Sequence, residues 1–262
     1  MLKNRLIPVL FLKNGYLVRS DNFSYHQNLG NPVSQVERYN AWNVDELIYI
    51  DISPTDIYDR GREDSRIENP GSILDIITMV SRKCFVPLTF GGRIRSLEDI
   101  RKRLSLGADK VTINTKALDD PSFINAAAKE FGSQAIIVSI DVLMNANGEY
   151  EVHRDFGKIP TGRKPDDWAA EAESQGAGEI FLNSINRDGA ANGYDTELIR
   201  KVVDRTGIPV IACGGVGDYK HFPYGIIEGG ASAVAAGNIF NFKELSYLLA
   251  KKELKKMNLN FR

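Results

Sequence analysis

A regular alternation of short apolar runs and longer amphipathic stretches constrains the fold of this chain more than any other feature of its sequence. The runs are apolar on both faces, which suits buried parallel strands better than half-exposed antiparallel ones. Eight strands that alternate with helices predict an α/β fold, a single (β/α)8 TIM barrel, and leave a doubly wound open sheet as the alternative. The predicted strands are residues 6–12, 47–52, 85–89, 110–113, 135–143, 179–182, 208–213 and 232–236, and helical periodicity marks residues 73–81, 97–106, 165–175 and 196–205.

An internal repeat favours the barrel over the open sheet. Gly91-Gly92 follows one predicted strand, and Gly214-Gly215 follows another 123 residues later. The same offset carries Gly107-Ala108 onto Gly230-Ala231, just before the next strand in each case. A pattern that occurs twice in this way is typical of a barrel built from two similar halves. We therefore expect a single domain over residues 1–262, with half-barrels at about 1–125 and 126–250.

Charge and hydropathy argue against several classes of protein. The sequence has 33 basic and 34 acidic residues and no block of like charge, so neither nucleic acid nor a membrane surface is an expected partner. Apolar runs such as residues 7–12 fall far short of the roughly 20 residues that a membrane span needs. The N-terminal residues lead directly into the first predicted strand, so we expect no signal peptide. Cys84 and Cys213 lie far apart within apolar runs, which favours a reduced, cytoplasmic protein.

The sequence lacks the common motifs for metals and nucleotides. Its three histidines, His26, His153 and His221, are scattered without the spacing of metal ligands. It contains no P-loop, no dinucleotide-binding fingerprint and no Gly-x-Ser-x-Gly nucleophile motif. We therefore expect neither a metal nor a cofactor, and we interpret Cys213 as a buried structural thiol.

Paired glycines after two strands are candidates for phosphate binding. Backbone N–H groups at Gly91-Gly92 and at Gly214-Gly215 are free to approach an anion closely. The following strands end at Asn114-Thr115 and at Ala236-Gly237, which add donors near the start of a helix. The alternative is that the glycines only permit tight turns between strand and helix. Two pairs at matched spacing favour phosphate binding, a recurrent function of barrels.

Carboxylates at strand ends are candidates for chemistry. Asp141 ends the run AIIVSID and Asp51 ends LIYID, so both are expected at the barrel mouth, where barrel enzymes hold their active sites. The alternative for each is a cap or turn residue. Asn183, Asp188 and Gly189 follow the sixth strand and are expected at the same mouth, although the segment also reads as an ordinary loop.

Charged residues stand at the opposite ends of four strands. Arg5, Glu46, Lys110 and Glu179 each begin a predicted strand, so they converge on the barrel floor. Two acids and two bases there are able to form a closed ring of ion pairs, since buried charges require partners. A solvated rim is the simple interpretation, and a gate to a passage through the barrel is the functional one.

Several segments together resemble the cyclase subunit of imidazole glycerol phosphate synthase, and the likeness runs nearly from end to end. They are DELIYIDI, LGADKVTINTKAL, FGSQA, GAGEIFLNSINRDG, GYDTELI and PVIACGGVG. The resemblance implies a barrel bound to a glutaminase partner, from which ammonia passes through the barrel floor. It further implies that Arg5, Glu46, Lys110 and Glu179 form the ammonia gate, and that Asp109 faces the glutaminase.

The substrate side departs from the family's pattern. The resemblance implies two catalytic aspartates: Asp141 matches the second, but Phe11 stands in place of the first. A phenylalanine cannot carry a proton, and one acid/base group commonly contributes about 10²–10⁴-fold to a rate. Residues 54–70 form a longer, strongly charged loop. The other departures are Arg19 for a lysine, Arg93 for the third glycine of the first phosphate loop, Cys213 and Gly237 for serines, and Asn186 for an aspartate.

The altered substrate side resembles barrel proteins of surface-polysaccharide clusters, which work with a glutaminase-like protein and an amidotransferase in acetamidino-sugar formation. Such relatives carry an apolar residue at the position of Phe11 and share the segments IPxLxLK, FLNSI and IACGG. The resemblance implies a small anionic substrate, an activated sugar whose N-acetyl group becomes an acetamidino group. Arg93 is then expected to bind a diphosphate or a sugar carboxylate. Two alternatives are a histidine-pathway cyclase that tolerates Phe11 and a non-catalytic ammonia conduit.

Overall fold

Eight parallel strands close into a barrel in the computed structural model, which describes residues 3–21, 23–58, 70–241 and 243–262. The barrel strands are β1 (Arg5–Lys13), β4 (Leu47–Asp51), β5 (Leu88–Gly91), β6 (Lys110–Ile113), β7 (Ile136–Met144), β10 (Glu179–Ser184), β11 (Val210–Cys213) and β12 (Ala233–Ala236). Strand β1 pairs with β12 and β4, and the pairing of β10 with β7 completes the circle. This topology confirms the predicted (β/α)8 barrel and rules out the open sheet.

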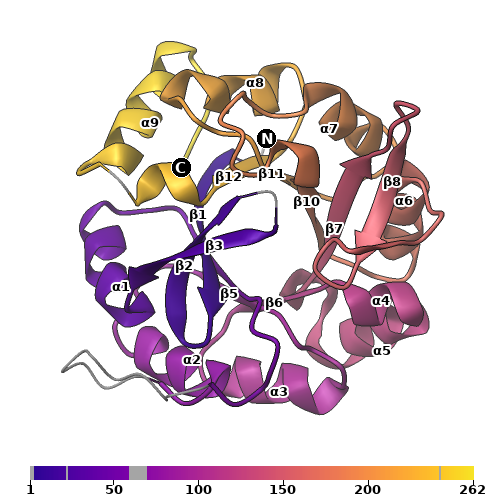
Figure 1. Cartoon of the computed structure of the whole chain (residues 1–262), viewed down its shortest axis with the longest axis horizontal. Coiled ribbons are helices and arrows are strands. Elements are labelled where there is room, and N and C mark those ends of the chain that lie inside the picture. The colour runs from indigo at the N-terminus through magenta and orange to yellow at the C-terminus, as the bar shows by residue number, and fades with distance from the viewer. Residues whose placement is uncertain (1–2, 22, 59–69, 242) are drawn as a thin grey trace.

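The helices form an outer ring around the strands (Figure 1). Sequence signals account for several of their starts: Ser96 and Asp99 make a reciprocal capping box, and Asp195 accepts from the backbone N–H of Leu198. The helices are α1 (Pro32–Ala41), α2 (Ile73–Ser81), α3 (Leu97–Ser105), α4 (Thr115–Asp119), α5 (Ser122–Phe131), α6 (Pro165–Ser174), α7 (Thr196–Val203), α8 (Phe222–Ile227) and α9 (Ser246–Lys256). Short 3₁₀ helices lie at Ser133–Ala135, Ile185–Arg187, Tyr219–His221 and Asn238–Phe240.

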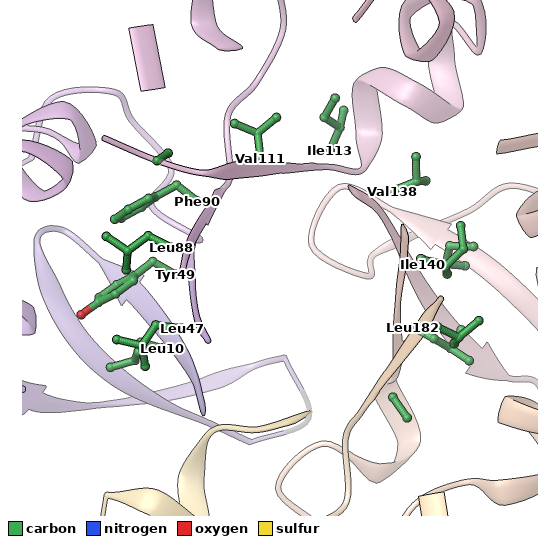
Figure 2. Packing of buried hydrophobic residues seen from close by; sticks show 14 of the residues in the cluster. Leu10, Leu47, Tyr49, Leu88, Phe90, Val111, Ile113, Val138, Ile140 and Leu182 are labelled. Carbon is green, nitrogen blue, oxygen red and sulfur yellow. The ribbon is translucent and has the colours of Figure 1, made fainter. Parts of the chain in front are cut away.

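The main core lies between the barrel and the helices. Leu10, Tyr49, Phe90 and Val111 belong to this cluster, and the rings of Tyr49 and Phe90 stack with their centroids 5.0 Å apart (Figure 2). Full burial of such a side chain stabilises the fold by about 1.5–3 kcal/mol. Because each strand contributes alternate residues to this layer, the residues in between face the interior of the barrel.

A second, smaller apolar cluster fills the barrel interior. On β1 the inward residues are Arg5 at the floor, then Ile7, Val9 and finally Phe11 at the mouth. The same alternation on the other strands brings charged residues to the floor and polar residues to the mouth. Between them lie apolar side chains together with the buried hydroxyl groups of Thr89, Thr112 and Ser139. The members of this interior cluster are Ile7, Val9, Phe11, Val18, Ile48, Ile137, Phe181, Ile211, Cys213, Ala233 and Ala235.

Two antiparallel hairpins extend the barrel sheet, and the sequence analysis missed both. Strands β2 (Tyr16–Asp21) and β3 (Tyr25–Gly30) extend the sheet from β1, whereas β8 (Tyr150–Arg154) and β9 (Ile159–Pro160) extend it from β7. These strands carry polar residues on their outer face, so a search for continuous apolar runs does not find them. Among the described residues, no helix combines the length and the apolar character that crossing a membrane requires.

One predicted strand begins too early. The run 85–89 was expected to be strand throughout, but Phe85 is 88% exposed and β5 starts only at Leu88. Pro87 has no N–H to donate to a sheet, and the N–H of Leu88 donates to the Asp109 carboxylate at 2.8 Å. The 123-residue offset carries β6 onto β12, which agrees with the repeat, while the division into half-barrels stays a prediction.

Candidate active site

Two neighbouring cavities open at the barrel mouth. The larger, of about 890 Å³, is lined by Asp51, Gly92, Arg93, Asn114, Thr115, Asp141 and Asn183 among others. The smaller, of about 340 Å³, is lined by Arg19, Asp188, Gly189, Cys213, Gly214, Gly215, Ala236 and Gly237 among others. Phe11 lines both cavities and is only 8% exposed, so its ring stands between them. The strand ends thus bring nearly all of the predicted substrate-side residues into one region.

Asp141 is buried at the mouth, on the interior face of β7. Its Oδ2 accepts a hydrogen bond from the Asn114 side-chain amide at 2.7 Å, and Asn183, its register partner on β10, donates to it as well. Burial raises the pKa of the Asp141 carboxyl to about 7, although both amides stabilise the charged form. A carboxyl that titrates near neutral pH is suited to take and return a proton.

Asp51 is also buried, but its carboxylate is held by its own loop. It accepts from the Ser53 backbone N–H at 2.9 Å, from the Ser53 hydroxyl, and from the Tyr58 hydroxyl at 3.1 Å. Burial raises the pKa of the Asp51 carboxyl, while these donors and Arg93 work to lower it. The structure therefore shows Asp51 organising the start of the β4–α2 connection, while a role in substrate binding stays a prediction.

Asp188 lies in the wall of the smaller cavity and ties it to the β2–β3 hairpin. Its Oδ2 accepts from the Ser20 hydroxyl at 2.7 Å and from the backbone N–H of Phe23 at 3.2 Å. Burial raises the pKa of the Asp188 carboxyl. Cys213 is buried nearby, and burial raises the pKa of its thiol far above neutrality, as expected of an unreactive structural cysteine.

The two Gly-Gly turns are required by backbone packing. A Cβ atom on Gly92 (φ +97°) would lie 2.1 Å from the Asp51 carbonyl oxygen, and one on Gly215 (φ +100°) 2.1 Å from the Gly193 carbonyl oxygen. The tight-turn interpretation accounts for both glycines, so phosphate binding here stays a prediction. Gly91 lies within β5 and lines neither of the two cavities.

Arg93 has an unusual backbone and an occupied side chain. Its φ is +57°, in the left-handed region that favours glycine, which agrees with the glycine that the family resemblance implies there. The guanidinium donates to the Asp56 carboxylate through Nε and to the Ser53 carbonyl oxygen at 2.9 Å through Nη1. The arginine expected to bind an anion thus lines the larger cavity with a carboxylate of the chain already on it.

At the floor, the four charged strand starts form a closed ring of ion pairs, the arrangement that the sequence analysis left open beside a solvated rim. Arg5 lies 2.9 Å from both Glu46 and Glu179, and Lys110 lies 3.6 Å from Glu46 and in direct contact with Glu179. Burial alone would raise the pKa of Glu179, but Arg5 and Lys110 outweigh it and lower that pKa. The solvated-rim interpretation is therefore wrong, since Glu46 is only 4% exposed. Asp109 lies exposed, directly before Lys110.

The sequence analysis missed the residues that hold the predicted ones in place. Ser53 has a local signal, because an aspartate followed two residues later by a serine is typical of an Asx turn. Tyr58, Ser20 and Asp56 have none, since each reaches its partner from another element or across a loop. The charged loop predicted at 54–70 is described only at residues 54–58 and 70; residues 59–69 lie outside the described part of the chain.

The fold and the site define a (β/α)8 barrel whose candidate chemistry lies at the carboxyl ends of the strands, where barrel enzymes hold their active sites. A family model described as histidine biosynthesis protein matches residues 5–246, and the chain belongs to that family. It is 44% identical over 266 residues to a Vibrio vulnificus (strain YJ016) protein named "Putative imidazole glycerol phosphate synthase subunit hisF2", covering all of this chain and 92% of that one. It is 38% identical over 262 residues to the "Imidazole glycerol phosphate synthase subunit HisF" of Alkaliphilus metalliredigens (strain QYMF), covering 100% of both chains.

Proposed function

We propose that this protein is the ammonia-accepting subunit of a glutamine-dependent complex, in which a glutaminase docks at the barrel floor near Asp109. The observation that carries the proposal is the pairing of a complete ion-pair ring at the floor with a mouth that lacks one catalytic aspartate. Arg5, Glu46, Lys110 and Glu179 close the floor, and the interior above them is largely apolar, with the hydroxyl groups of three buried side chains among the apolar ones: Thr89, Thr112 and Ser139. An interior that is largely apolar and, among the described residues, holds no charge between floor and mouth favours neutral ammonia over ammonium, because burying an unpaired charge is costly.

The chemistry proposed for the mouth is the conversion of an acetamido group on an activated sugar into an acetamidino group. Ammonia attacks the carbonyl carbon, a C–N bond forms, and the carbonyl oxygen leaves as water. The attacking nitrogen loses two protons and the departing oxygen gains two, and Asp141 is placed to carry them one after the other, since its pKa of about 7 allows both uptake and release. This substrate class follows from the family resemblance, and a third protein, the amidotransferase, completes the complex.

Phe11 argues against the closure of an imidazole ring in this barrel. The ring-closing reaction of the family is implied to need two aspartates, and the first position here holds a buried phenyl ring between the two cavities. The names of both relatives favour the synthesis of imidazole glycerol phosphate as the second candidate function, and the description of the matching family model as histidine biosynthesis protein favours the histidine pathway. A conduit without chemistry is the third.

A direct assay separates the first two candidates. The purified protein is given ammonium salt and the bisphosphate ribulosyl substrate of the histidine-pathway cyclase, and release of imidazole glycerol phosphate is measured beside a Phe11→Asp variant. We expect no turnover by the natural protein. Appreciable turnover would return it to histidine biosynthesis and show that one aspartate suffices. An ammonia-dependent gain in the variant would show that the scaffold persists without its original chemistry.

Two further variants, tested in the complete complex with product formation as the readout, examine the channel and the chemistry. Lys110→Met is expected to uncouple glutamine hydrolysis from product formation while product formed from added ammonium is unchanged. Unchanged coupling would refute the channel. Asp141→Asn is expected to lower product formation from both nitrogen sources by about 10²-fold or more. Full activity of that variant would leave the barrel as a conduit only.

A further inference from the structure

We infer that the β4–α2 connection carries a built-in competitor for the substrate: the Asp56 carboxylate sits on Arg93 and Arg95 where a bidentate oxyanion of the substrate binds. The inference deepens the proposed function and rests on it for the assumption that the substrate is anionic. Asp56 contacts Arg93 through Nε and lies 3.7 Å from Nη1 of Arg95. Because carboxylates and phosphates present the same paired oxygens to a guanidinium, one is able to replace the other.

The backbone conformation of Arg93 and the position of its side chain favour a role in binding a ligand over a purely structural role. An L-residue in the left-handed region costs about 1–2 kcal/mol, a strain that glycine at this position would avoid. The strained backbone directs a charged side chain, only 9% exposed, into the wall of the larger cavity. Strained residues of this kind cluster at ligand-binding and active sites.

The two ends of the Arg93–Asp56 pair differ sharply in accessibility. The Asp56 side chain is 65% exposed and comes from a loop, whereas Arg93 is nearly buried. Because the Asp56 carboxylate is solvated, it returns to water at little cost when another anion takes its place on Arg93. Once Asp56 leaves, Arg93 needs another anion, because a nearly buried cation without a partner is costly. This asymmetry distinguishes a replaceable internal ligand from a permanent structural pair.

Three arginines act on the Asp56 carboxylate, and the carboxylates of Asp51 and Asp99 act on the same group of arginines. Arg103, only 4% exposed, lies behind the turn and donates to the carbonyl oxygens of Gly92 and Asp99 at 3.0 and 2.9 Å. Within the described residues, its Nε is buried without a hydrogen-bond partner. Arg93, Arg95 and Arg103 all lower the pKa of the Asp56 carboxyl, Arg93 most strongly.

Displacement of Asp56 would also affect the hydrogen bonds that hold the Asp51 carboxylate. The same connection supplies Ser53 and Tyr58, which hydrogen-bond the Asp51 carboxylate, and the Ser53 carbonyl oxygen accepts from Arg93. Binding of the anion therefore moves Asp56 within residues 53–58, a described part of the connection whose other contacts hold the buried Asp51 carboxylate at the mouth. The ligand class is a bidentate oxyanion, either the diphosphate of an activated sugar or a sugar carboxylate.

Isothermal titration calorimetry tests the inference with two probes, inorganic pyrophosphate for the diphosphate and glucuronate for the carboxylate. Asp56→Asn removes the charge of the competitor and is expected to raise the affinity for the correct probe about three- to fivefold. Arg93→Gly, which also relieves the strained backbone, is expected to abolish that binding. Arg93→Lys keeps the charge without the paired donors and is expected to weaken it. Glu37→Gln, which breaks the exposed ion pair with Lys83 on the outside of the barrel, is the matched control and should change nothing.

Each outcome decides the question. The probe whose affinity rises in Asp56→Asn and is lost in Arg93→Gly identifies the source of the oxyanion. The same conclusion holds if the natural protein binds too weakly to measure and only Asp56→Asn shows binding. Binding whose affinity Asp56→Asn leaves unchanged would overturn the inference that Asp56 is a competitor. Binding that Arg93→Gly also leaves unchanged would take place elsewhere in the protein and overturn the site itself. Absence of binding to both the natural protein and Asp56→Asn would overturn it as well. The titrations need no ammonia, partner or turnover, so their result is independent of whether the proposed reaction occurs.

Discussion

Removal of Arg5 from the floor ring tests whether the ring is a single buried electrostatic unit. Arg5 donates four hydrogen bonds, at 2.9–3.4 Å, to Glu46 and Glu179, whose side chains are 4% and 11% exposed. Breaking a buried ion pair costs about 3–5 kcal/mol, because the remaining charge loses its partner. Lys110 still contacts both carboxylates, so we expect Arg5→Met to lower the free energy of unfolding by about 3 kcal/mol.

The loss is expected to depend on pH. The pKa of Glu179 is lowered in the folded protein, since Arg5 and Lys110 outweigh the effect of burial. A carboxyl of this kind stabilises the fold above its unfolded pKa, about 4.3, and this stabilisation disappears as the pH falls through the folded value. The difference between natural protein and variant is therefore full at pH 7 and shrinks below about pH 4.

Urea unfolding followed by circular dichroism at several pH values measures both effects. Lys83→Met, which breaks the exposed pair with Glu37, is the control and is expected to cost at most about 1 kcal/mol. Adding Glu179→Gln to Arg5→Met removes one of the stranded charges, so the double variant should lose less than the sum of the two single losses. Additive losses, or an Arg5→Met variant as stable as the control, would refute the view of the ring as one coupled unit.

Three other results are expected. Burial raises the pKa of Asp141 to about 7, so an NMR titration should show one carboxyl carbon resonance that shifts near neutral pH. A carboxyl whose pKa is raised in the folded protein lowers the free energy of unfolding as the pH increases from about 4 to 7. Asp141→Asn should therefore be more stable than the natural protein at pH 8 but not at pH 3.5. If the difference in stability does not depend on pH, the assignment is contradicted. Gly92→Ala should cost about 3 kcal/mol in urea unfolding, since its Cβ would meet the Asp51 carbonyl oxygen at 2.1 Å. Lys251→Met should cost about 3 kcal/mol or more by the same measurement, because Asp45 pairs with it at 2.7 Å while buried.

The fold could be predicted because each barrel strand is buried on both faces. A run such as RLIPVLFLK is apolar at every position except its ends, and only a parallel barrel or a doubly wound sheet buries such runs throughout. The hairpin strands could not be found in this way, since Tyr25–Gly30 is largely exposed and polar. The start of β5 was wrong because Pro87 and the Asp109 carboxylate, rather than hydrophobicity, decide where that strand begins.

The candidate site could be predicted in outline, because strand order sends every carboxyl end to the same mouth. Asp141, Asn114 and Asn183 meet there although they are far apart in the sequence. What the sequence does not contain is the pairing between loops. The contact of Asp56 with Arg93 joins residues 37 positions apart, and no periodicity or motif relates them.

Phe11 has a second consequence, which follows from the alternation along β1. The inward residues of that strand are Arg5, Ile7, Val9 and Phe11, so the apolar lining that begins above the floor ring continues to the mouth. An aspartate at the last position would end that lining one layer earlier and place a charge beside the passage. Under the proposed function, phenylalanine at this position has two effects. It takes the place of a proton-carrying aspartate, and it extends the apolar lining along β1 to the mouth, where Asp141 lies. Loss of the ring-closing group and better protection of ammonia from protonation are then effects of the same substitution.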